Sequence, residues 1–209
     1  MINSKVLTSV YQSIQAIEKL LRPQNLTFIE EAAVLIAECF LQGNKLIIAG
    51  NGGSLCDAAH FAEELTGFFR QKRRALPAIA LCEPGHLTCV GNDIGLEWAF
   101  ARGVEAYGKP GDIFIGLTTS GNSPNIIRAF EASQQQQLKT IAFLGKTGGA
   151  LKGVADLEMI IEGFETSDRI QEVHMAAIHI IIEMIEDKLF SESSKSILVN
   201  KQALMDIRS

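Results

Sequence analysis

Apolar residues near the start of the chain recur at helical spacing. Between residues 2 and 21 they fall on one stripe, which predicts an amphipathic helix that ends before Pro23. A second helix is predicted over residues 27–41, where the polar sequence QGN closes it. We expect these two helices to form an N-terminal helical extension over about residues 1–43.

Beyond this extension, short apolar runs alternate with longer segments of helical pattern. We predict strands over residues 45–50, 78–81, 112–117, 139–144 and 157–161, and helices over residues 54–68, 96–107, 123–136 and 168–189. Strands that alternate with helices indicate an α/β fold in which helices cover both faces of a parallel sheet. No linker or repeat divides the chain, so we expect a single domain over residues 1–190 and a polar C-terminal tail over residues 191–209.

The last predicted helix, residues 168–189, is apolar in nearly every direction. The residues responsible are Ile178, Ile180, Ile181, Ile182, Met184 and Ile185. A helix that is apolar all round is buried. In a chain of 209 residues, this favours burial at a subunit interface as well as in the core.

Composition and charge exclude several classes of partner. The net charge is −5 and no long basic run occurs, which argues against a nucleic-acid partner; the basic cluster at residues 70–74 is typical of a solvated loop. No apolar run is long enough for a membrane span, and no secretory leader is visible. The four cysteines form no C-x-x-C pair, so we expect reduced thiols and a cytoplasmic location.

Two glycine- and hydroxyl-rich loops follow predicted strands, GNGGS at residues 50–54 and TTSGNS at residues 118–123. Ligands of parallel sheets bind beyond the carboxyl ends of the strands, and each loop leads into a helix N-terminus, which favours an anion. The loops lack a Walker lysine and the G-x-G-x-x-G pattern, so a small phosphate monoester suits them better than a nucleotide. The alternative is that their serines and threonines only cap helices. A third polar segment, GND at residues 91–93, is predicted to be a turn that meets a sugar hydroxyl.

Two helices carry polar side chains suited to proton transfer or metal binding. His60 and Glu64 are four residues apart and share a helix face directly after the first loop; a surface ion pair is the alternative. On the last helix, Gln171 and His179 are separated by about 80° around the axis. His174 lies three residues after Gln171 and is a competing candidate.

Taken together, the motifs within residues 32–189 resemble those of a known family. They are GNGGS followed by CDAAHFAEELTG, VGND, TTSGNS, and DRIQE followed by two histidines. In these motifs the chain resembles the phosphoheptose isomerases, a branch of the sugar isomerase (SIS) family. The resemblance implies a three-layer αβα sandwich with a five-stranded, flavodoxin-like parallel sheet, assembled as a homotetramer with sites between subunits.

The resemblance also implies an activity and a role for each motif residue. Sedoheptulose 7-phosphate would become D-glycero-D-manno-heptose 7-phosphate, the first step toward nucleotide-activated heptose for lipopolysaccharide or other surface glycans. Glu64 would be the base and His179 the acid of an enediol mechanism. The substrate would contact Asn51, Gly52, Gly53, Ser54, Glu64, Asn92, Asp93, Thr118, Thr119, Ser120, Ser123 and Gln171. Zinc would be bound by His60, Glu64, Gln171 and His179, and no nucleotide cofactor is implied.

The chain departs from the family pattern at three places. Thr118 stands where serine is expected and keeps the hydroxyl; Phe68 stands where arginine is expected, so Arg70 or an arginine of another subunit would replace that charge. The C-terminal tail is longer than expected. A non-catalytic sugar-phosphate sensor or a protein that binds a replication initiator is the alternative function, although neither would need His60, Glu64 and His179. A different sugar phosphate as substrate is a further alternative.

Overall fold

A five-stranded, wholly parallel sheet forms the centre of the computed structural model, which describes residues 3–191. Its strands are β1 (Leu46–Gly50), β2 (Ala78–Ala80), β3 (Ile113–Thr118), β4 (Lys139–Gly145) and β5 (Leu157–Ile161). Each lies within one residue of its predicted bounds, and the order across the sheet is β2-β1-β3-β4-β5. The predicted tail lies outside the described residues, except for Ser191.

Seven α-helices and three short 3₁₀ helices are assigned within residues 3–191. They are α1 (Ser4–Glu18), η1 (Lys19–Leu21), α2 (Pro23–Leu41), α3 (Gly53–Thr66), α4 (Pro84–Asp93), η2 (Leu96–Trp98), α5 (Ala99–Tyr107), α6 (Pro124–Gln135), η3 (Gly149–Leu151) and α7 (Ser167–Phe190). The second helix begins four residues earlier than predicted because Pro23 occupies its first turn, where the missing N–H of proline costs nothing. None of these helices is both long enough and apolar enough to cross a membrane.

Helix α4 was not predicted, and the expectation of a polar turn at residues 91–93 is wrong. These residues form the last turn of α4. The helix starts because the Glu83 side chain accepts hydrogen bonds from the backbone N–H groups of Gly85 and His86, while Pro84 takes the first helical position. No residue of α4 is buried, so the helix has no apolar stripe for a pattern to reveal.

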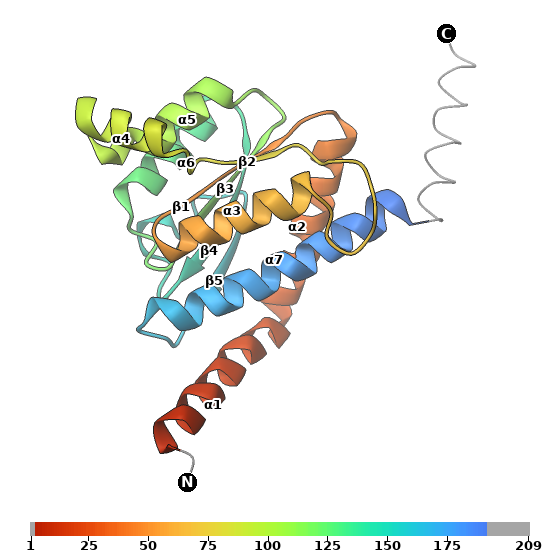
Figure 1. Ribbon diagram of the computed structural model, residues 1–209, viewed down its shortest axis with the longest axis vertical. Helices are drawn as coiled ribbons and strands as arrows, with labels where there is room; N and C mark the ends of the chain where they lie inside the picture. The colour runs from red at the N-terminus through yellow and green to blue at the C-terminus, as the bar shows by residue number, and fades with distance from the viewer. Residues whose placement is uncertain (1–2, 192–209) are drawn as a thin grey trace.

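Helices cover both faces of the sheet (Figure 1). Alternate strand residues point to opposite faces, so Ile48 belongs to one core and Ile47 to the other. Helices α2, α3 and α7 supply the first core, and α5 and α6 supply the second. The result is the predicted three-layer sandwich, with α1 projecting from its lower end in Figure 1.

The apolar run of α7 is buried within its own subunit. Ile178, Ile181, Ile182 and Ile185 are fully buried, whereas Ile180 is 39% exposed. The expectation that α7 presents a wide apolar face to another subunit is therefore wrong for most of this run, because the first core alone covers it.

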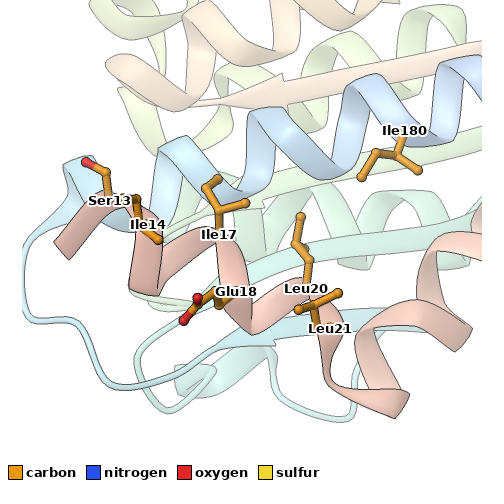
Figure 2. A pocket seen from close by; sticks show the side chains of 7 residues that line it. All are labelled: Ser13, Ile14, Ile17, Glu18, Leu20, Leu21 and Ile180. Carbon is orange, nitrogen blue, oxygen red and sulfur yellow. The ribbon is translucent and has the colours of Figure 1, made fainter. Parts of the chain in front are cut away.

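Exposed apolar side chains lie instead on α1 and η1. They are Val6, Leu7, Val10, Tyr11, Ile14, Ile17 and Leu21. Where α1 and η1 meet α7, Ile14, Ile17 and Ile180 line an apolar groove of about 490 Å³ (Figure 2). The N-terminal helix is thus amphipathic, as predicted, and part of its apolar face has no cover within residues 3–191.

Candidate active site

The topology of the sheet brings the two predicted anion loops together. Strand β1 pairs with β3, and Gly50 at the end of β1 lies opposite Leu117 near the end of β3. From β1 the chain continues to β2 on one side, whereas β3, β4 and β5 lie on the other. The crevice at such a switch point is the usual ligand site of an open parallel sheet.

A cavity of about 310 Å³ lies at this point. Its lining residues are Asn51, Gly52, Gly53, Ser54, Leu117, Thr118, Thr119, Ser123, Ser167 and Gln171. The N-termini of α3, α6 and α7 all contribute to this lining. Backbone N–H groups and helix dipoles therefore favour an anion in the cavity.

The hydroxyls around the cavity are not used as helix caps. Ser123 occupies the N-cap position of α6, but its side chain makes no capping bond; its Oγ lies 3.1 Å from the Thr118 Oγ1. Thr119 Oγ1 similarly lies 3.1 Å from the Oγ of Ser167, which the sequence analysis missed. Ser120 is not among the residues that line the cavity, and its Oγ accepts the backbone N–H of Asn122; its predicted contact with phosphate stays a prediction. The capping interpretation of Ser123 is therefore wrong, and its hydroxyl faces the cavity.

Glycines allow α7 to approach the first loop. Gly52 has a φ of +56°, a backbone conformation that residues with a side chain rarely adopt. A Cβ at Gly53 would lie 2.6 Å from the Gln171 Oε1, so only glycine fits there without displacing Gln171. The Gln171 amide donates to the Ser54 Oγ at 3.4 Å, which joins α7 to the start of α3.

A reciprocal amide pair fixes the two loops relative to each other. Asn51 donates to Asn125 and Asn125 donates to Asn51, both at 2.8 Å. Asn125 is buried and also accepts the backbone N–H of Ile126 at the start of α6. Each amide has further hydrogen-bonding capacity, so Asn51 can still meet a ligand.

His60, Glu64 and His179 form a second cluster. One ligand atom of each lies within 4.8 Å of the others. His60 Nε2 is 3.3 Å from the Glu64 Oε1, and the rings of His60 and His179 are 5.1 Å apart. The Glu64 side chain is 20% exposed and that of Glu63 is 67% exposed, so Glu64 is the more enclosed of these two neighbouring carboxylates.

The surroundings of His179 favour a neutral imidazole. The ring stacks on Phe69 with the ring centroids 5.5 Å apart. Burial lowers the pKa of His179 below its ordinary value; the nearby His60 and Arg70 act in the same direction, and Glu64 opposes them. A neutral imidazole can donate one N–H and accept at its other nitrogen, and it is also the form that binds metals.

The donor set of this cluster suits zinc. Two imidazole nitrogens and one carboxylate oxygen are common zinc ligands, and ligands in a tetrahedral site lie about 3.3 Å apart. Gln171, the fourth predicted ligand, lies two turns earlier on α7 and bonds to Ser54. Its part in a metal site stays a prediction.

His174 is a core residue. It is fully buried, its Nε2 donates to the carbonyl oxygen of Leu144 at 3.0 Å, and its ring meets that of Phe143 edge to face. Burial lowers the pKa of His174 to about 4. Of the two histidines, His179 and not His174 lies beside Glu64.

Asn92 and Asp93 do not line the cavity. Both are exposed at the end of α4, where the Asn92 amide donates to the Asp93 carboxylate at 2.9 Å. Their predicted contact with substrate stays a prediction. Phe68 is exposed, and Arg70 forms an ion pair with Glu183, one turn after His179 on α7.

Asp57 was also missed by the sequence analysis. It lies three residues before His60 on α3, and this spacing places the two side chains on the same side of the helix. Its Oδ2 is buried without a hydrogen-bond partner among residues 3–191, and burial raises the pKa of Asp57 to about 6. The spacing of three residues between Asp57 and His60 could have shown in the sequence that Asp57 lies near the cluster.

Comparison with known proteins shows the family of this chain. The SIS domain family matches residues 10–145, so the chain is a SIS-domain protein. A phosphoheptose isomerase of Fusobacterium nucleatum is 57% identical over 164 residues, which cover 78% of this chain and 84% of that protein. One of Vibrio cholerae is 53% identical over 165 residues, covering 79% and 86%.

Solved structures match the same family. The structure of a phosphoheptose isomerase from Neisseria gonorrhoeae matches with a TM-score of 0.82 and 34% identity, covering 88% of this chain and 98% of that one. The chain belongs to the phosphoheptose isomerase family and is an aldose–ketose isomerase.

Proposed function

We propose that this protein converts sedoheptulose 7-phosphate to D-glycero-D-manno-heptose 7-phosphate. The observation that carries the proposal is that α3 begins at the anion cavity and then carries His60 and Glu64 to the second cluster. An α-helix rises about 9 Å between Ser54 and His60. A seven-carbon sugar that carries phosphate at one end and reacts at the other suits two subsites spaced along one helix.

The cavity would hold the phosphate end. Thr118, Thr119 and Ser123 would donate hydroxyl hydrogen bonds, together with backbone N–H groups at the helix N-termini. These contacts are the same for ketose and aldose, so they supply binding and orientation rather than rate. The product would feed nucleotide-activated heptose synthesis for surface glycans.

Glu64 and His179 would move the protons. Glu64 takes a proton from carbon 1 of the ketose and returns it to carbon 2 through an enediol. The neutral His179 donates its N–H proton to the carbonyl oxygen at carbon 2 and takes one from the hydroxyl at carbon 1. Both side chains end the step as they began, so no other reactant is consumed.

We further propose that His60, Glu64, Gln171 and His179 hold zinc. The ion would supply polarisation of substrate oxygens or would stabilise the assembly. Glu64 and His179 cannot act freely as base and acid while both are fully committed to a metal. Elemental analysis of protein purified without chelator tests occupancy, and absence of zinc even after its addition would leave these residues to acid–base chemistry alone.

We propose a homotetramer with sites shared between subunits. The support is the apolar face of α1 and the groove in Figure 2, which one subunit leaves open. A cytoplasmic location is also proposed, since Cys39, Cys56, Cys82 and Cys89 are free thiols.

An isomerase assay with sedoheptulose 7-phosphate beside other ketose phosphates tests the function. We expect turnover with the seven-carbon substrate to exceed turnover with the others. Faster turnover of another sugar would reassign the substrate. Tight binding without any turnover would favour the non-catalytic sensor instead.

A further inference from the structure

A buried carboxylate on α7 organises the loop of residues 67–74. The Glu186 side chain is 1% exposed. It accepts the backbone N–H groups of Phe69, Arg70 and Gln71 at 3.2, 3.0 and 3.1 Å, and the Nε of Arg73 at 2.8 Å. Because a buried charge is costly without partners, these four bonds hold the loop against α7.

Its partner, Arg73, is equally buried and holds the end of α3. Its guanidinium donates to the backbone carbonyl oxygens of Glu64 and Leu65 at 2.9 and 2.8 Å and to that of Gly67 at 3.0 Å. The Arg73–Glu186 pair therefore joins three segments: the turn of α3 that carries Glu64, the 67–74 loop, and α7.

The loop that this pair anchors lies against His179. The loop places the Phe69 ring parallel to the imidazole, with an angle of 16° between the two planes. It also places Arg70 beside Glu183. No hydrogen bond of the His179 ring is found within residues 3–191, and the ring packs against those of Phe69 and His60. Catalytic imidazoles more often take their orientation from a hydrogen-bonded carboxylate or carbonyl group.

We propose that Phe69 and the Arg73–Glu186 pair are positioning residues for the proposed isomerase reaction, and that they act by fixing the plane of the His179 imidazole. This inference rests on the proposed function. None of the three residues is required to touch the substrate. Their effect passes through His179 and through the backbone at Glu64.

The chain offers a matched control at the other end of the sheet. Asp112 is fully buried and accepts the backbone N–H groups of Lys45 and Lys109, both at 3.0 Å, and it pairs with the Lys45 ammonium. Asp112 lies just before β3, at the end of the sheet opposite the cavity. Asp112→Asn therefore perturbs a similar buried pair without touching the surroundings of His179.

The experiment compares Phe69→Leu, Phe69→Tyr, Glu186→Gln and Asp112→Asn in the full-length protein. With sedoheptulose 7-phosphate, Phe69→Leu and Glu186→Gln should lower kcat by roughly 10- to 100-fold and change KM less than twofold, because misplacement affects the chemical step. Phe69→Tyr keeps the ring and should retain kcat. Asp112→Asn should lower the thermal midpoint and leave kcat unchanged. If Glu186→Gln does not fold, the two Phe69 variants still test whether the ring at position 69 is needed for kcat.

A second readout does not depend on turnover. In protein with ¹³C-labelled histidine, the Phe69 ring should shift the His179 C–H resonance. That shift should persist in Phe69→Tyr and Asp112→Asn and be lost in Phe69→Leu and Glu186→Gln. If the wild type shows the shift but no turnover, the proposed function fails and the stacking arrangement stands. Unchanged kcat in Phe69→Leu, or an equal loss of kcat in Asp112→Asn, would overturn the positioning role.

Discussion

Glu63 and Glu64 are neighbours in the sequence but have different surroundings. Glu64 belongs to the cluster with His60 and His179, whereas Glu63 is mostly exposed. Glu64→Gln keeps size and hydrogen bonding and removes the base, so turnover should fall by roughly 100-fold or more while folding and substrate binding persist. Initial rates and calorimetry measure these effects.

Glu63→Gln is the control and should change turnover little. Solvent deuterium should enter the product at the transferred carbon with the native protein and hardly at all with Glu64→Gln. An essential Glu63 beside a dispensable Glu64 would contradict the assignment of the base.

His174 should make the fold sensitive to acid. Its pKa is lowered to about 4 in the folded protein, against about 6.5 when unfolded. Between these values the unfolded chain binds more protons, so the free energy of unfolding decreases as pH falls. From pH 7.5 to pH 5 this single group should remove about 2 kcal/mol. Urea unfolding should show a smaller loss for His174→Gln, which keeps a donor for Leu144; equal losses would argue against the prediction.

Local spacing revealed some of these residues and could not reveal others. His60 and Glu64 share a helix face, so sequence alone could pair them. Arg73 and Glu186 are 113 positions apart, and their ion pair depends on how α7 crosses α3. The sequence shows only their charges, and charges in such positions are usually solvated.

At the scale of elements, the start of α6 should determine phosphate affinity. Ser123→Ala removes a hydroxyl that faces the cavity, and one hydrogen bond to a charged group contributes about 1.5–3 kcal/mol. Substrate binding should weaken by roughly 10- to 100-fold in calorimetry, with the fold intact. Ser120→Ala is the matched control in the same loop and should weaken binding less, because its hydroxyl bonds to Asn122. Equal effects would show that both serines act only on the loop.

Strands were predicted more reliably than helices for a physical reason. Every strand residue from Leu46 to Gly50 is buried, so the apolar run is continuous. In α4 nothing is buried, and the cap at Glu83 is the main signal. A cap of this kind can be recognised in the sequence, although glutamate is a less common capping residue than aspartate or serine.

At the scale of the whole molecule, α1 should drive self-association. Light scattering at micromolar concentration should give the mass of a tetramer. Val10→Lys together with Tyr11→Lys places charge on the exposed face of α1 and should shift the protein toward smaller species. Lys5→Glu, on the same helix, changes charge without changing apolar area and serves as the control. If the wild-type protein is a stable monomer at this concentration, both the proposed tetramer and the proposed sites shared between subunits are wrong.

The sequence pattern alone could not predict the order of the strands in the sheet. Alternating elements predict a parallel sheet but do not place β1 between β2 and β3; the family resemblance implied a five-stranded, flavodoxin-like sheet. That order creates the crevice, so the location of the cavity could not follow from pattern alone. The division at residue 190 stays a prediction, since residues 192–209 lie outside the described part of the chain.

The short edge strand β2 has a consequence for behaviour at high concentration. It ends the sheet with only Ala78–Ala80, and Pro77 stands immediately before it. Proline lacks a backbone donor, and three residues offer little ladder for another chain to extend. Crowded copies of this protein therefore have a poor template for strand addition at β2, which lowers the risk of amyloid-like stacking there while leaving contacts through α1 available.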